Sequence, residues 1–253
     1  MKNFLYFDAD SNIPFIYNYC DAWCDRCAFT ARCAVFRQNA DLMESDPNPV
    51  QLGLWQNNTI KLVAAKQWLK AKSKEYRHPL VASTEDERRI FDVEANDIRR
   101  ELDSIAVIQL AKRYQEKVLK WLKTDDIKHV LKEIEQNSKE NKILEEPLWV
   151  IQWYVHFIYV ICHRAVQGLI DEEDDFEDDE NPFPKDSDGS AKIAFISAEN
   201  SLVAWHQLVT VMPDEESFIV KAMALLEAVM EEGDFEFPNA RKFIRPGFDE
   251  INL

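Results

Sequence analysis

Four of the five cysteines of the chain lie within fourteen residues, at Cys20, Cys24, Cys27 and Cys33. Their spacing is C-x3-C-x2-C-x5-C, and sets of four thiolates hold both structural zinc and iron–sulfur clusters. Residues 1–19 carry one lysine and an apolar run broken by polar side chains, which is not the pattern of a signal peptide. We therefore expect a reducing, cytoplasmic location, and a metal or cluster site rather than disulfides.

The spacing also bears on the kind of metal. If residues 17–41 form a helix, Cys20, Cys24 and Cys27 stand at i, i+4 and i+7 and share one face. Helical neighbours at this spacing have Cβ atoms roughly 5–6 Å apart. A tetrahedral zinc, with Zn–S bonds of about 2.3 Å, needs sulfurs only about 3.8 Å apart. The helical interpretation thus favours a 4Fe–4S cluster, and zinc stays open because i, i+4 pairs also bind it.

A second set of residues that could do chemistry runs along the most apolar segment, 148–162, and one residue beyond it. It is a stripe of hydrogen-bonding side chains at helical spacing, formed by Gln152, His156, Tyr159 and His163. Burying such groups without partners costs about 1–3 kcal/mol each, so other side chains must face them. The candidates are three residues at helical spacing on a predicted long helix, Asp97, Glu101 and Ser104, together with Glu199 and His206. The stripe is either a core hydrogen-bond network or the lining of a binding pocket.

The charge of the chain is strongly acidic, with a formal net charge of −16. Residues 171–188 hold eleven carboxylates against one lysine, so this segment contributes −10 of the total. Such a balance argues against direct binding to a nucleic-acid backbone. We predict that 171–189 is a mobile, solvated loop, which could hold a basic protein partner.

Several helices must position these residues. The chain is 46% hydrophobic with only five glycines and shows no convincing strand alternation, which indicates an all-α protein. Fifteen apolar residues at 148–162 are too few to span a bilayer, so this segment is predicted to be a core helix. We predict one domain over 1–253, an irregular bundle of about six or seven helices. Residues 1–45 form a cysteine-rich arm and helix, and 235–253 form an ordered tail. Helices are expected at 17–41, 50–76, 84–123, 125–140, 148–162, 191–212 and 214–232.

Three functions are consistent with these patterns. The leading hypothesis is a metal-binding protein, with an iron–sulfur cluster favoured over zinc, in a structural or redox-sensing role. The second is an enzyme whose pocket is lined by the stripe with Asp97 and Glu101, the four cysteines then holding structural zinc. The third is an interaction scaffold that uses the acidic loop. No phosphate-binding glycine loop, G-x-S-x-G or H-E-x-x-H motif is present, which argues against NTPases, α/β-hydrolases and zincins.

Overall fold

The structure is a computed structural model that describes residues 12–38, 67, 102–135, 142–174 and 185–250. Contacts divide the chain into two compact units, one of Met1–Asn12 and Ala28–Ile98, the other of Ile13–Cys27 and Arg99–Leu253. The described residues form helices and contain no strand, so the all-α prediction is confirmed. The helix predicted at 50–76 lies outside the described residues except for residue 67, and so does the first part, 84–101, of the helix predicted at 84–123.

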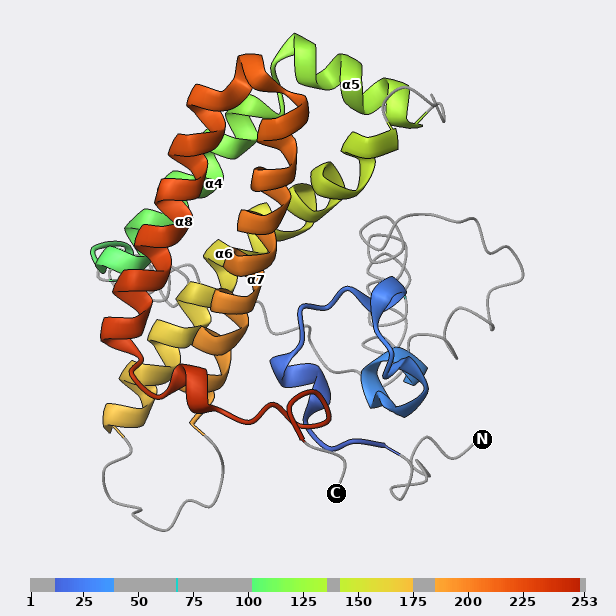
Figure 1. Cartoon of the computed structure of the whole chain (residues 1–253). Coiled ribbons are helices and arrows are strands. Elements are labelled where there is room, and N and C mark those ends of the chain that lie inside the picture. The colour runs from blue at the N-terminus through green and yellow to red at the C-terminus, as the bar shows by residue number, and fades with distance from the viewer. Residues whose placement is uncertain (1–11, 39–66, 68–101, 136–141, 175–184, 251–253) are drawn as a thin grey trace. The chain divides into compact units, whose positions relative to one another are not determined.

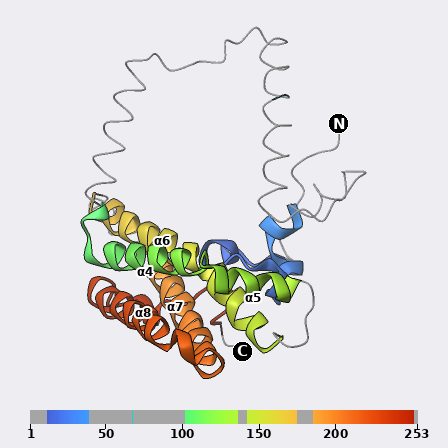
Figure 2. The same cartoon turned by 90° about the horizontal axis from the view of Figure 1, so that it is seen from above.

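Four helices of the larger unit form an antiparallel bundle (Figure 1). They are α4 (Ala106–Trp121), α6 (Lys142–Asp174), α7 (Asp186–Val211) and α8 (Glu216–Glu236). Each packs on two neighbours, in the circular order α4, α6, α7, α8. Seen from above, α4 and α6 form one layer over α7 and α8 (Figure 2). The short α5 (Asp125–Glu135) connects α4 to α6 at one end of the bundle (Figure 1).

The core follows from apolar residues at helical spacing. In α4, Ile108, Ala111 and Val118 are completely buried and stand three to seven residues apart, so they share one face. Trp121 closes the end of the bundle: its ring stacks on Phe218, and its indole N–H donates to Glu215 at 2.8 Å. An aromatic pair of this kind contributes about 0.5–1.5 kcal/mol beyond its buried area.

Small residues allow α6 and α7 to approach closely. A methyl group on Gly168 would lie 3.1 Å from the backbone nitrogen of Ser187, which is tighter than ordinary contact. Ser197 and Ser201 are buried, and their hydroxyls donate to carbonyls four residues earlier at 2.8 Å. The serines thus satisfy their own polar atoms and add little bulk at the helix surface.

The helix predicted at 17–41 is wrong over most of its length. The chain instead makes isolated 3-10 turns, η1 (Ile16–Tyr19) and η2 (Cys24–Arg26) in the larger unit and η3 (Thr30–Arg32) in the other. Only residues 34–38 are described as α-helix. Ala22 is left-handed, with φ 56°, and the residue after η1 is extended, so the i to i−4 bonding of an α-helix cannot continue.

Other boundaries also differ from the predictions. Helix α6 begins at Lys142, before Pro147, and continues to Asp174, while α7 begins at Asp186. The acidic segment predicted as a loop over 171–189 is therefore helical at both ends, and 175–184 lie outside the described residues. The α-helix predicted over 84–123 is interrupted at 104–105, directly before α4. No helix in the described part of the chain is long and apolar enough to cross a membrane.

The C-terminal tail, which the structure describes as far as residue 250, packs at the N-terminal end of α7. Lys192 of α7 donates to the carbonyl of Phe243 at 2.5 Å and pairs with Asp249 at 2.8 Å. Arg245 forms two further bonds to the Asp249 carboxylate, at 2.9 and 3.0 Å. The ring of Phe243 lies 4.7 Å from that of Tyr19, so the tail also holds the segment that leads into the cysteines.

Candidate functional site

The cysteines occupy turns rather than one helical face. Cys20 follows η1, while Cys24 begins η2 and Cys27 ends it, its N–H donating to the carbonyl of Cys24 at 3.1 Å. Cys33 belongs to the other compact unit and follows η3. All four are half-buried, and none of the five cysteines, all of which are described, is in a disulfide. Within the described ranges, no three His, Cys, Asp or Glu side chains are gathered as metal ligands.

Because Cys20, Cys24 and Cys27 do not share one α-helix, helical spacing no longer favours an iron–sulfur cluster over zinc. The wide Cβ separations assumed for i, i+4 pairs do not apply to a 3-10 turn. Cys24 and Cys27, with two residues between them in a tight turn, have the C-x2-C spacing that structural zinc sites use. The spacing now suits either metal centre.

The cysteine segment is anchored to α6 by polar bonds around Asp21. The Asp21 carboxylate accepts the hydroxyl of Tyr154 at 2.6 Å, and its carbonyl accepts the indole N–H of Trp153 at 3.0 Å. Burial, then the hydrogen bond and negative charge of Asp21, raise the pKa of Tyr154 well above its ordinary value. The phenol therefore stays protonated and keeps donating to Asp21.

Aromatic and ionic contacts reinforce this anchor. The ring of Trp23 stacks on Trp153, with centroids 4.8 Å apart, and the guanidinium of Arg26 lies 3.8 Å above Trp23. Arg26 also binds Glu146 through both carboxylate oxygens, one of them at 2.8 Å. These contacts fix Trp23 and Arg26, which flank Cys24 and Cys27, against the bundle.

The polar stripe of α6 lies at the rim of the bundle and not in its core, so the expectation that these side chains are buried is wrong. Gln152 and His156 are exposed, and Tyr159 and His163 are half-buried. Asp97 and Glu101, two of the predicted partners, lie outside the described residues. The partners that the structure describes come from α4 and the turn before it: the amide of Gln115 donates to Nδ1 of His156 at 3.0 Å, with the tautomer assigned to match.

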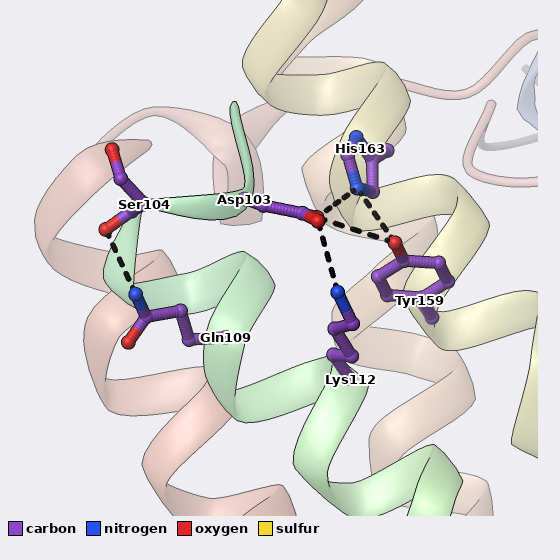
Figure 3. Close-up of polar contacts among 6 residues, drawn as sticks. All are labelled: Asp103, Ser104, Gln109, Lys112, Tyr159 and His163. Carbon is purple, nitrogen blue, oxygen red and sulfur yellow. Dashed lines mark hydrogen bonds and ion pairs between the residues drawn. The ribbon is translucent and has the colours of Figure 1, made fainter. Parts of the chain in front are cut away.

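Asp103 is the member of this polar cluster that the sequence interpretation missed. Its carboxylate points between α4 and α6 (Figure 3). Oδ2 accepts from the ammonium of Lys112 at 2.9 Å, while Oδ1 lies 3.4 Å from both the Tyr159 hydroxyl and Nε2 of His163. Nε2 of His163 is also 3.1 Å from the Tyr159 hydroxyl. Asp103 precedes the helix interruption at 104–105, where the main-chain carbonyl of Ser104 accepts the side-chain amide of Gln109 at 3.3 Å.

Asp103 and Lys112 each stabilise the charged form of the other. The hydrogen bond and positive charge of Lys112 hold the pKa of Asp103 below its ordinary value, and Asp103 in turn raises the pKa of Lys112. Asp103, Lys112, Tyr159 and His163, with Val160, line an open pocket of about 480 Å³. That volume is within the range of small-ligand sites.

The Asp-Ser pair at 103–104 was the available sequence signal for this cluster. Both residue types compete with the backbone for hydrogen bonds and favour turns over helix interiors. They therefore indicated that the long helix could be interrupted here. In the structure it is interrupted at 104–105, and the Asp103 carboxylate contacts side chains of α6.

Cys162 has a different environment from the other cysteines. It lies in α6 with 2% of its surface exposed, and burial raises the pKa of its thiol to about 12. It packs as a small apolar side chain, and its thiol is chemically inert in the folded protein.

Comparison with known proteins adds no relative: no family model matches the chain, and no curated protein or solved structure shows significant similarity.

Proposed function

We propose that this protein is a metal-binding helical bundle in which Cys20, Cys24 and Cys27 are thiolate ligands. The spacing predicts Cys33 as the fourth ligand. The observation that carries the proposal is the Cys24–Cys27 turn, because it places two thiols at the ends of one 3-10 turn on an anchored segment. Thiolates are soft ligands that select zinc or iron–sulfur clusters over hard cations.

The anchoring of the segment supports a structural or redox-sensing role. Asp21, Trp23 and Arg26 bond to α6, so a metal bound beside them would be held directly against the bundle. Loading or losing the metal would then change how firmly the N-terminal segment is ordered. All four cysteines are half-buried, which leaves an oxidant access to their sulfurs.

The test is metal analysis with an absorption spectrum, on full-length protein purified without oxygen. We expect one thiolate-bound zinc, or one iron–sulfur cluster with its visible absorption, per chain. Cys24→Ser should lose the metal, whereas Cys162→Ser should keep it, because Cys162 is buried away from any ligand role. Absence of metal in the anaerobic protein, together with failure to take up zinc or a reconstituted cluster, would refute the proposal.

The alternative of an enzyme has one supporting observation, the pocket at Asp103 and His163. Nε2 of His163 is already in contact with the Asp103 carboxylate and the Tyr159 hydroxyl. To act as a general base, this nitrogen would have to lie within hydrogen-bond reach of the substrate proton instead. The geometry therefore favours binding over acid–base catalysis at this pocket.

A further inference from the structure

Two oxygen atoms and one nitrogen atom lie close together beside α6, and none of them belongs to the cysteine segment. Oδ1 of Asp103 is 3.4 Å from the hydroxyl of Tyr159 and 3.4 Å from Nε2 of His163, and the last two atoms are 3.1 Å apart. Hydrogen bonds from hydroxyl to oxygen prefer about 2.7–2.8 Å, so the contact between Tyr159 and Asp103 is long for a hydrogen bond. The three atoms form a nearly equilateral triangle whose corners are a carboxylate oxygen, a phenol oxygen and an imidazole nitrogen.

These separations also match the distances between ligand atoms around a transition-metal ion. Zinc bonds to imidazole and carboxylate at about 2.0–2.2 Å, and ligands at the corners of a tetrahedron are then about 3.3–3.5 Å apart. The observed separations of 3.1 to 3.4 Å lie close to that value. We propose that Asp103, Tyr159 and His163 form a second metal site, which binds Zn²⁺ or a similar first-row ion through three protein ligands.

The elements that carry these atoms are suited to hold an ion. Tyr159 and His163 are one turn apart on α6, so they share a face of a regular helix, and Asp103 reaches them from the turn before α4 (Figure 3). No large rearrangement is needed to bring the three ligands together. Burial is partial, with 27% of the Asp103 side chain and 20% of the His163 side chain exposed.

Lys112 supplies the outer support that a ligating carboxylate requires. Its ammonium bonds Oδ2 at 2.9 Å, which orients the carboxylate and leaves Oδ1 to face the other two ligands. Its positive charge also opposes a cation nearby, so the site should bind more weakly than four thiolates. On binding, Tyr159 either coordinates as a neutral phenol or releases its proton to solvent.

The fourth position of the ion would face the pocket. The three ligands, Lys112 and Val160 line an open space of about 480 Å³, enough for a water molecule and a small ligand. Three protein ligands with an open position are the arrangement of zinc sites that bind water or substrate, whereas closed sites have four. The proposed site thus has the form of a binding site for a small anion or neutral donor.

The test is cadmium-113 NMR of the full-length chain, reduced, stripped of metal and loaded with Cd²⁺. Cadmium bound by thiolates and cadmium bound by oxygen and nitrogen resonate in separate regions, so the cysteine centre and this site are observed independently. We expect a resonance in the oxygen and nitrogen region, and it should disappear in His163→Gln. In Tyr159→Phe, the apparent affinity for Cd²⁺ that this resonance reports should fall at least tenfold. His206→Gln, an exposed histidine of α7, is the control and should leave it unchanged.

Two outcomes would overturn the second site: no resonance in the oxygen and nitrogen region, or one that persists in His163→Gln. Circular dichroism of each variant confirms that the bundle is folded, and Tyr159→Phe tests the site without removing a large packed ring. The thiolate resonance is expected in every variant, and its absence would count against the cysteine centre alone.

Discussion

At the scale of the residue, Tyr114 shows how the core controls a polar group. Its side chain is completely buried between helices, and its hydroxyl accepts the indole N–H of Trp205 at 3.1 Å. Burial raises the pKa of Tyr114 to about 12, because the phenolate would lose its hydration. The hydroxyl is therefore a permanent neutral member of the core.

Replacing this hydroxyl tests its energetic role. Tyr114→Phe should lower the free energy of unfolding by about 1–3 kcal/mol near neutral pH, because the buried indole N–H of Trp205 loses its acceptor. Urea unfolding followed by circular dichroism measures this change. Trp205→Phe together with Tyr114→Phe removes donor and acceptor alike, so the double variant should lose less than the sum of the single losses.

The same substitution changes the dependence on alkaline pH. Because the folded pKa of Tyr114 is above the unfolded value of about 10, its contribution is complete below pH 10 and is lost as the pH rises through about 12. The Phe variant lacks this component, so its stability should fall less over that interval. Equal slopes in the two proteins would contradict the burial of a protonated phenol.

At the scale of the element, the C-terminal tail is fixed to α7 mainly through one carboxylate. Asp249 is bound by Arg245 and by Lys192, and all three side chains are at most 20% exposed. Burial opposes ionisation of Asp249, but the bonds from Arg245 and Lys192 outweigh it and hold its pKa below the ordinary value. The tail is therefore held by an ionised, nearly buried pair.

Asp249→Asn should cost about 1–3 kcal/mol of stability at pH 7, because both cations lose their partner charge. A lowered folded pKa contributes stability above the unfolded pKa of about 3.9, and this is lost as the pH falls through the folded value. The difference between wild type and variant should accordingly shrink when urea unfolding is repeated near pH 3.

Asp234→Asn is the matched control for the tail. Asp234 also binds an arginine, Arg241, but both side chains are more than 40% exposed. Solvent screens such a pair, so the control should change stability by less than about 1 kcal/mol. A similar loss in both variants would mean that the tail contributes no more than a surface ion pair.

At the scale of the whole molecule, the single core thiol reports on the integrity of the bundle. Cys162 is 2% exposed in α6, and its pKa of about 12 leaves almost no thiolate near neutral pH. A thiol reagent can reach it only when the helices separate.

We expect the metal-free protein to react with a thiol reagent in two phases. The half-buried cysteines, Cys20, Cys24, Cys27 and Cys33, should react first, and Cys162 at a rate set by unfolding. Mass spectrometry after timed alkylation resolves the two phases. Tyr114→Phe should accelerate the slow phase about tenfold for each 1.4 kcal/mol lost, and fast reaction of Cys162 in folded protein would disprove cooperative opening.

The amino-acid sequence alone determined the parts of this protein that depend on local pattern. Apolar residues at helical spacing indicated the helices, and these assemble into an all-α bundle as predicted. The burial of Cys162 followed from its place in the most apolar segment. Both are nearly local properties, since hydrophobic periodicity specifies which face of a helix must be covered.

The tertiary structure decided the conformation of the cysteine segment and the partner of the α6 stripe. Residues 20–27 form turns because Asp21 and Trp23 bond to Tyr154 and Trp153, more than a hundred positions away, and no local pattern contains that contact. Asp103 meets His163 because the chain turns before α4. Spacing identified the thiols and the histidine, but contacts between distant segments determined which atoms stand beside them.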